Sequence, residues 1–301
     1  MSTVNFIKSL ADLTMATGQH KMPPDDNWQA PQDAGENEKN NYVNGVGTQN
    51  WGVGFPVADG FVSYFATQDM HTYHFTCAST MTKVYRDFIY TMIDATQYAF
   101  NLWKPTLFFK NLKINGPVAV GSKGCLTTTA DFAKLFNSYP GHASISGGKH
   151  FNKWRDAVGK GVAKCLKNFI DGVTVPGLPW YPAFAAFPGP VAPPMPNVPA
   201  MLTMCPSTGM ADITTGKKLQ KAMLDEFDGG LADDCQEKIH KTIFSAIAEV
   251  LSMGFTLWVS TQTISLVMGT GQIPTFAPPV VPAGPVVNGQ NIPSGGGNLM
   301  P

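Results

Sequence analysis

The sequence predicts a mainly α-helical fold: a bundle of long helices, with Pro- and Gly-rich extended segments and a few short strands between them. Three observations predict this class. Residues 80–103 carry apolar side chains at steps of three and four, the spacing of one face of an amphipathic helix. Similar patterns return in residues 239–258 and 149–171. The connecting segments are rich in proline, which has no backbone N–H to donate to a sheet.

The two most regular helical patterns indicate an internal repeat. Adding 155 to the apolar positions of residues 84–102 gives apolar or small residues again, and Phe100-Asn-Leu-Trp103 becomes Phe255-Thr-Leu-Trp258. A Gly-Pro-Val tripeptide follows each of the three helical stretches, at residues 116–118, 189–191 and 284–286. Chance is the alternative explanation, because the chain contains 30 Gly and 24 Pro.

The N-terminal third is predicted to combine a helix with a long polar arm. Residues 3–18 form the helix, and residues 21–45 are too polar to bury enough surface to fold alone. In this arm we expect Trp28 and Tyr42 to anchor the chain on a neighbour, although a flexible surface linker is an equal alternative. Residues 50–66 hold one or two short strands or an ordered loop.

The middle of the chain follows the first long helix, which Pro105 stops. Residues 107–121 alternate in polarity and end near Gly-Pro, which predicts a strand and a turn. A short helix is expected over residues 129–136. A degraded second copy of the long helix covers residues 149–171, where two glycines each cost about 1 kcal/mol relative to alanine.

Residues 175–206 are the densest proline region, so we expect an extended or polyproline-like backbone with few donors for a sheet. Its aromatic residues are expected to lie over an apolar surface, either of this chain or of a partner: Trp180, Tyr181, Phe184 and Phe187. A further helix is predicted over residues 211–228 and the last long helix over 233–267. The Gly- and Pro-rich tail follows, with Phe276 as another interaction residue.

Four segments are therefore expected along the chain. They are an N-terminal helix with its polar arm, a first helical unit, a second unit with the Pro-rich segment, and a third unit with the tail: residues 1–48, 49–137, 138–206 and 207–301.

Composition favours a protein that works inside an assembly. Charged residues make up only 14% of the chain, against about 25% in typical soluble domains, and the formal net charge is zero. A free chain with so little charge tends to associate. Without an excess of Lys and Arg, no nucleic acid partner is expected. The N-terminus does not read as a secretory signal, so we expect synthesis in the cytoplasm.

Few residues suggest a chemical site, and we expect no catalytic residue and no cofactor. The five cysteines form no CxxC pair, so reduced buried thiols are the expectation. The best metal candidates are His71, His74 and Cys77, at helical spacing. Zinc needs three or four ligands, and no fourth is evident nearby. Histidines making ordinary hydrogen bonds at the start of a helix are therefore the favoured interpretation.

Residues 243–268 raise a membrane alternative. The segment is long enough to cross about 30 Å of hydrocarbon and carries a single charge, Glu249. Eight Ser, Thr and Gln side chains accompany that charge, and a charge near a helix centre is costly in a bilayer. A helix buried in a bundle or at a subunit interface explains the segment better.

Two proline-rich segments, FPGPVAPPMPNVP and PTFAPPVVPAGPVVNGQ, resemble in style the structural proteins of phage tails and contractile injection particles. The resemblance implies a non-enzymatic ring, cap, plug or baseplate subunit of a virion or other assembled particle. Its expected partners are copies of itself and other particle subunits. The alternatives are a membrane-active or pore-forming protein that uses residues 243–268, and a metal-dependent enzyme with a site near His71 and His74.

Overall fold

The computed structural model describes residues 6–17, 67–145, 150–227, 239–278 and 283–300. The chain divides into two units, of which one comprises Met1–Thr14 with Ile89–Pro301 and the other Met15–Phe88. In the second unit the described elements are the end of α1 (Ser9–Thr17) and the first part of α3 (Thr67–Trp103). All other elements, and the remainder of α1 and α3, belong to the first unit.

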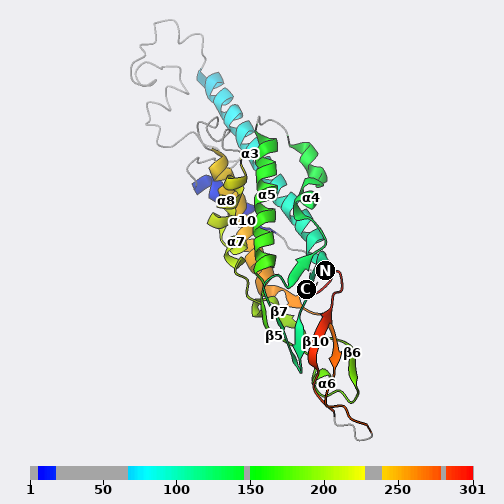
Figure 1. Cartoon of the computed structure of the whole chain (residues 1–301). Coiled ribbons are helices and arrows are strands. Elements are labelled where there is room, and N and C mark those ends of the chain that lie inside the picture. Colours follow the sequence, from blue (N-terminus) through cyan, green and yellow to red (C-terminus); the bar gives the residue numbers. More distant parts are fainter. Residues whose placement is uncertain (1–5, 18–66, 146–149, 228–238, 279–282, 301) are drawn as a thin grey trace. The chain divides into compact units, whose positions relative to one another are not determined.

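The predicted mainly α class is wrong. About 53% of the described residues are helical and 22% are in strands, which form a six-stranded antiparallel sheet and smaller sheets of two and three strands. The fold is therefore mixed α/β. Figure 1 shows the helices of the first unit at one end of the six-stranded sheet, with the short helix α6 (Pro182–Ala185) at its other end.

Several predicted helices are confirmed. The pattern in residues 80–103 lies within α3, residues 129–136 overlap α4 (Phe132–Asn137), and residues 149–171 correspond to α5 (Phe151–Gly172). The carboxylate of Asp131 begins α4, because its Oδ1 accepts hydrogen bonds from the backbone N–H groups of Ala133 and Lys134 at 2.9 and 3.3 Å.

Two predicted helix ranges need correction. Residues 211–228 form two helices, α7 (Met210–Thr214) and α8 (Gly216–Glu226), because Thr215 has an extended backbone. The last long helix, α10 (Ile239–Thr261), ends before residue 267, where the chain turns into strands. Three short 3-10 turns complete the helical elements: η1 (Lys104–Thr106), η2 (Pro140–Ser144) and η3 (Leu202–Met204).

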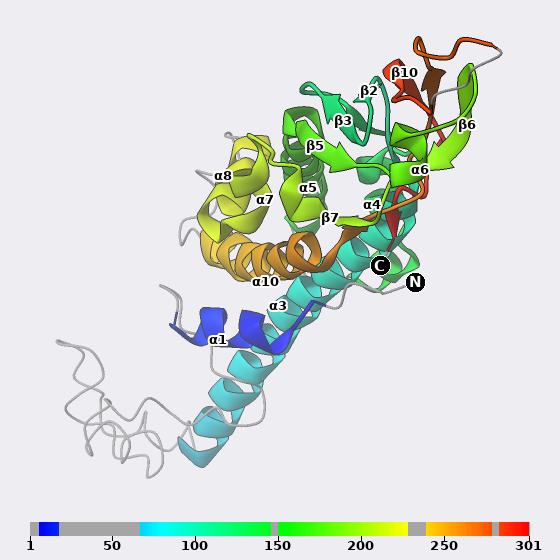
Figure 2. The ribbon, with the colours of Figure 1, turned by 90° about the horizontal axis from the view of Figure 1, so that it is seen from below.

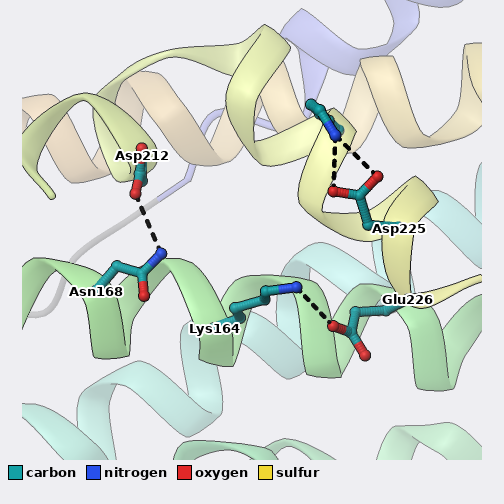
Figure 3. A network of polar contacts seen from close by, with 6 residues as sticks. Lys164, Asn168, Asp212, Asp225 and Glu226 are labelled. Atoms are coloured by element: carbon teal, nitrogen blue, oxygen red, sulfur yellow. Dashed lines mark hydrogen bonds and ion pairs between the residues drawn. The ribbon is translucent and has the colours of Figure 1, made fainter.

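The helices α7 and α8 pack against both α5 and α10 (Figure 2). Gly161 makes the contact between α5 and α8 possible, because a Cβ atom there would lie 2.7 Å from the backbone nitrogen of Met223. Polar contacts rim this interface (Figure 3): Lys164 Nζ lies 3.0 Å from Glu226 Oε1, and Asn168 Nδ2 donates to Asp212 Oδ2 at 3.2 Å. The glycine that weakens α5 as a helix thus brings α8 close to it.

The ends of the three long helices meet in one aromatic cluster. The ring centroid of Phe100 in α3 lies 5.2 Å from that of Phe255 and 5.0 Å from that of Trp258, both in α10. Phe169 of α5 lies 5.7 Å from Trp258. These phenylalanines occupy equivalent places in the three helices, since 69 residues separate Phe100 from Phe169 and 155 separate Phe100 from Phe255. All three are fully buried.

The N-terminal segment covers this cluster. Phe6 packs edge-on against Phe255 with 5.5 Å between ring centroids, over Gly254, where a side chain would collide with the Phe6 ring. An ion pair between Lys8 and Asp94 fixes the start of α1 on α3, at 2.6 Å.

The six-stranded sheet is built from three pairs of strands, each following one long helix. The strand order is β5-β3-β2-β10-β9-β6. The second strand of each pair hydrogen-bonds to the first strand of another pair: β3 to β5, β6 to β9 and β10 to β2. Three strand pairs thus follow one another in a cyclic order. The bounds are β2 (Lys113–Asn115) with β3 (Val118–Gly121), β5 (Val175–Pro179) with β6 (Val191–Pro196), and β9 (Met268–Gln272) with β10 (Val287–Ile292).

The edge strands β5 and β6 are joined as well. An antiparallel bridge links Trp180 to Asn197, and the N–H of Val198 donates to the carbonyl of Pro179 at 2.9 Å. This staggered connection closes the sheet on itself, as a small barrel requires. Its interior is filled, because a Cβ atom on Gly269 would lie 2.9 Å from the Trp180 ring.

Two small sheets join the helices to the barrel. One pairs β1 (Leu107–Phe109) with β4 (Leu126–Thr128). The other has the order β11-β8-β7, formed by Leu299–Met300, Thr263–Ile264 and Ala200–Met201. The strand and turn predicted for residues 107–121 are confirmed as β1, β2 and β3.

Residues 175–206 were expected to supply few hydrogen-bond donors for a sheet. That expectation is wrong, since the segment forms the strands β5, β6 and β7. Its prolines are accommodated rather than excluded. The register between β6 and β9 shifts between Ala192 and Met195, and the exposed residues Pro193 and Pro194 occupy that bulge.

Candidate interaction surface

The three Gly-Pro-Val tripeptides lie together at one end of the barrel, which we call the turn end. Equivalent backbone hydrogen bonds connect them to the neighbouring strand pair. The carbonyl of Pro117 accepts from Trp180 N at 2.7 Å, and that of Pro190 from Ile273 N at 2.9 Å. The carbonyl of Val286 accepts from Gly116 N at 2.7 Å. Each tripeptide therefore leads into the second strand of one pair and holds the residue that follows the first strand of another.

The turn end exposes one valine from each strand pair. Val118, Val191 and Val287 are 41%, 50% and 42% exposed, although each begins a strand. Val191 and Val287 both lie opposite Gln272 of β9, so a row of Val191, Gln272 and Val287 runs across the outer face of β6, β9 and β10. The row contains no charged group.

Three predicted interaction residues extend this surface. Tyr181 is exposed, while Phe187 and Phe276 are partly exposed. Phe187 forms a bridge with Gly284, which joins the loop after β5 to the loop after β9. The turn-end surface is therefore defined as Val118, Tyr181, Phe187, Val191, Phe276 and Val287.

Two other predicted interaction residues lie inside the protein. Trp180 is 2% exposed, and its indole Nε1 donates to the carbonyl of Met195 at 3.1 Å. Phe184 is fully buried, 6.2 Å from the Trp180 ring. Both side chains pack the protein's own core beneath the turn end. Trp28 and Tyr42 lie outside the described residues.

Charge is partitioned along the chain. Residues 172–211 and 250–301, which contain the second and third strand pairs, have no Asp, Glu, Lys, Arg or His. Between Lys104 and Asp131, around the first pair, the charged residues are Lys110, Lys113 and Lys123. The helices carry the described ion pairs, such as those between α5 and α8 (Figure 3). The barrel consequently presents a surface with few cations and no anions.

A second apolar surface lies on the helices. Leu102 of α3 and Leu257 of α10 are 45% and 53% exposed, and the spacing of 155 relates them. One turn before them are the exposed side chains of Tyr98 and Met253, related in the same way. At the corresponding positions of α5, Lys167 forms an ion pair with Asp171. Two of the three equivalent helix faces are therefore apolar, and the third is charged.

The metal candidates are not tested by this geometry. His71, His74 and Cys77 lie in α3 within the second unit, and their side chains are outside the described part. Among the residues that the structure describes, no group of three or more His, Cys, Asp or Glu could hold a metal ion.

The described cysteines are unsuited to nucleophilic chemistry. Cys125, Cys165 and Cys205 are free and buried. Burial raises the pKa of the Cys125 thiol to about 11, and that of the Cys165 and Cys205 thiols to about 12. These thiols remain protonated at neutral pH, whereas the thiolate is the reactive form.

The apolar segment that raised the membrane alternative is α10. By length and composition alone this helix could cross a membrane, but 72% of its most apolar window is buried inside the protein. Its single charge also has a structural place, since the carboxylate of Glu249 lies against Gly216 at the first turn of α8. A negative charge there is favourable for the helix dipole.

The sequence analysis missed the three exposed valines. Their signal is present for two of them, because Val118 and Val191 directly follow a Gly-Pro turn and would be expected to pack inside a strand. Val287 lies one residue further on, after the buried Val286. The long stretches without charge were a second signal.

No protein-family model, no curated protein sequence and no solved structure matches this chain.

Proposed function

We propose that this chain is a non-enzymatic structural subunit of a large multi-subunit particle, such as a ring, cap, plug or baseplate component of a phage tail or contractile injection system. The observation that carries the proposal is the barrel with few charges and an exposed apolar turn end. A soluble protein that works alone normally surrounds its apolar surface with charge. Here the charge is confined largely to the helices, and the barrel has few cations and no anions.

The exposed apolar residues on α3 and α10 add a second point of support. Apolar positions that recur on two equivalent helices, and are replaced by an ion pair on the third, fit a chain whose neighbours cover two of its faces. A subunit with at least two contact surfaces can be built into a continuous assembly rather than only a closed pair. Copies of this chain and other subunits of the particle are the proposed partners.

The test is the association state of the purified full-length chain, measured by light scattering after size-exclusion chromatography and by negative-stain microscopy. We expect oligomers or particles whose fraction grows with protein concentration. An uncharged interface should also persist at high ionic strength, because salt screens interactions between charges but leaves apolar burial intact. A monodisperse monomer at every concentration and salt level would contradict the proposed function.

A further inference from the structure

We propose that the turn-end surface is a self-association site, which binds the turn end of a second copy of this chain. The inference rests on the proposed function. It names the partner for one of the chain's two exposed apolar surfaces, the turn end. The occupant follows from the distribution of charge and from the kind of side chains that the surface exposes.

The charge argument favours a copy of the same chain. In a contact between two identical patches, residue i of one copy meets residue j of the other, so a patch whose charges all have one sign meets like charges. Like charges in such positions are destabilising. The segments that form the second and third strand pairs contain no charged residue, so these parts of two turn ends can face each other without repulsion. The net charge of zero adds no long-range repulsion between two copies.

The side chains at the turn end also fit a contact with their own kind. Val118, Val191 and Val287 present short, rigid apolar groups that lose little conformational entropy when they are covered. Tyr181 and the two partly exposed phenylalanines supply the larger aromatic area that is typical of interface centres. A different partner protein would normally be selected by complementary charges, which this surface does not offer.

The nearest cations lie on the first strand pair, away from the row formed by Val191, Gln272 and Val287. Lys113 of β2 lies opposite Gln290 of β10, three residues along that strand from Val287. Its exposed ammonium group therefore belongs to the rim of the surface. At the rim a lysine can remain in water while the apolar residues are covered.

The strand β10 offers a matched pair of substitutions. Val287 and Ile292 are both exposed, by 42% and 40%, but Val287 lies at the turn end and Ile292 at the helix end, opposite Met268. We expect Val287→Asp to weaken self-association of the full-length chain by roughly tenfold or more, because the contact would then bury an unpaired charge. Ile292→Asp should leave association unchanged. Sedimentation velocity over a concentration series measures both, and circular dichroism checks that each variant folds.

A second variant tests the geometry of the contact. In a contact between two identical turn ends, Val287→Cys should form a symmetric disulfide-linked dimer under mild oxidation, and Ile292→Cys should not. If Val287→Asp associates as well as the wild-type chain does, the inference is overturned and the proposed function stays in place. Loss of association in Leu257→Asp alone would place the self-contact on the helices and also overturn it. A wild-type chain that stays monomeric, or that floats with neutral phosphatidylcholine vesicles through Val287, would overturn both proposals.

Discussion

Asn197 and Asn291 make the same pair of hydrogen bonds to two segments of the chain that are 155 residues apart. The amide oxygen of Asn291 accepts from Leu112 N at 2.7 Å, and its Nδ2 donates to the carbonyl of Phe109 at 2.7 Å. The amide oxygen of Asn197 accepts from Val267 N at 2.9 Å, and its Nδ2 donates to the carbonyl of Ile264 at 3.1 Å. Both side chains are buried. Each asparagine comes from the second strand of one pair, or directly after it, and holds the start of the next pair.

These contacts predict that Asn197→Ala and Asn291→Ala destabilise the protein by similar amounts. Each change leaves one buried N–H and one buried carbonyl without the asparagine partner, and each such loss costs about 1–3 kcal/mol. We expect a decrease in the free energy of unfolding of about 2–4 kcal/mol, measured by urea titration. Gln290→Ala is the control, because Gln290 is exposed beside Asn291 on the same strand. If the control costs as much as Asn291→Ala, the two hydrogen bonds are not the cause.

The paired asparagines also show which part of the fold could be predicted from the sequence. The helices were predictable because their apolar faces repeat within a few residues, and the spacing of 155 relates Phe100 to Phe255 by identity. The same spacing relates the backbone groups that the two asparagines hold. Asn197 and Asn291 themselves are not related by it, because the loops between the strands differ in length. A constant offset in the sequence therefore detects the helices and misses the strands.

The barrel could not be predicted for a related reason. Its strands are short, and partners such as Lys113 and Gln290 are far apart in the sequence. Proline is frequent in β5 and β6 of the second strand pair, and it argues against a sheet when that segment is considered alone. The structure accommodates Pro193 and Pro194 in a bulge, which only the pairing with β9 reveals. For the predicted interaction residues the sequence could not separate exposed from buried side chains: in the same proline-rich segment Tyr181 is exposed and Phe184 is a core residue.

Gly161→Ala should destabilise the protein although alanine is the better helix former. The gain in helix propensity is about 1 kcal/mol. Against it stands overpacking, which costs about 1–3 kcal/mol when neighbouring atoms cannot move. The atoms that a new Cβ would meet at 2.7 and 2.8 Å are backbone atoms of Met223. We therefore expect a net loss of about 1–2 kcal/mol in thermal or urea unfolding.

The neighbouring Lys160 provides the control for this glycine, since it is exposed on α5. Lys160→Ala should change stability by less than about 0.5 kcal/mol. A stabilised Gly161→Ala variant would show that α8 moves away from α5 without loss, contrary to the tight contact between the two helices.

The buried thiols predict a loss of stability at alkaline pH. Burial raises the pKa of Cys165 from 9.0 to about 12, so the folded state holds this proton more tightly than the unfolded chain does. The resulting contribution to stability is fully present below pH 9.0 and is lost as the pH rises toward 12. Urea unfolding at pH 8 and pH 10 should therefore show a lower free energy at pH 10. In Cys165→Ala the decrease should be smaller than in the wild type.

Thiol labelling gives an independent check of the same burial. At pH 8 in native buffer, iodoacetamide should leave the peptides that contain Cys125, Cys165 and Cys205 unmodified, and in urea it should label all three. Mass spectrometry of the digested protein distinguishes these peptides from the others. Rapid native labelling of Cys165 would show that its thiol is accessible and ionisable, and the alkaline prediction would then fail too.

Phe100 and Leu102 should separate stability from assembly, because they lie two residues apart in α3 with opposite exposure. Phe100 is fully buried between Phe255 and Trp258, and Leu102 is 45% exposed. Phe100→Ala removes a core side chain, so we expect it to lower the free energy of unfolding by about 3–5 kcal/mol. Leu102→Ala should cost little in unfolding.

Association should rank Phe100→Ala and Leu102→Ala in the opposite order. Under conditions where both variants are folded, Leu102→Ala should weaken association more than Phe100→Ala does. Leu102 and Leu257 form the exposed helix surface that the proposed function assigns to a neighbouring subunit. Leu102→Asp combined with Leu257→Asp should therefore reduce the size of the assemblies seen by light scattering while melting temperatures stay near the wild-type value. The matched control is Asp171→Ala on α5, because Asp171 is the position equivalent to Leu102 and is charged and exposed. Because the turn end lies on the barrel, the Leu102/Leu257 double variant should still form the disulfide-linked pair through Val287→Cys. Equal loss of both contacts in this double variant would mean that the two surfaces do not act separately.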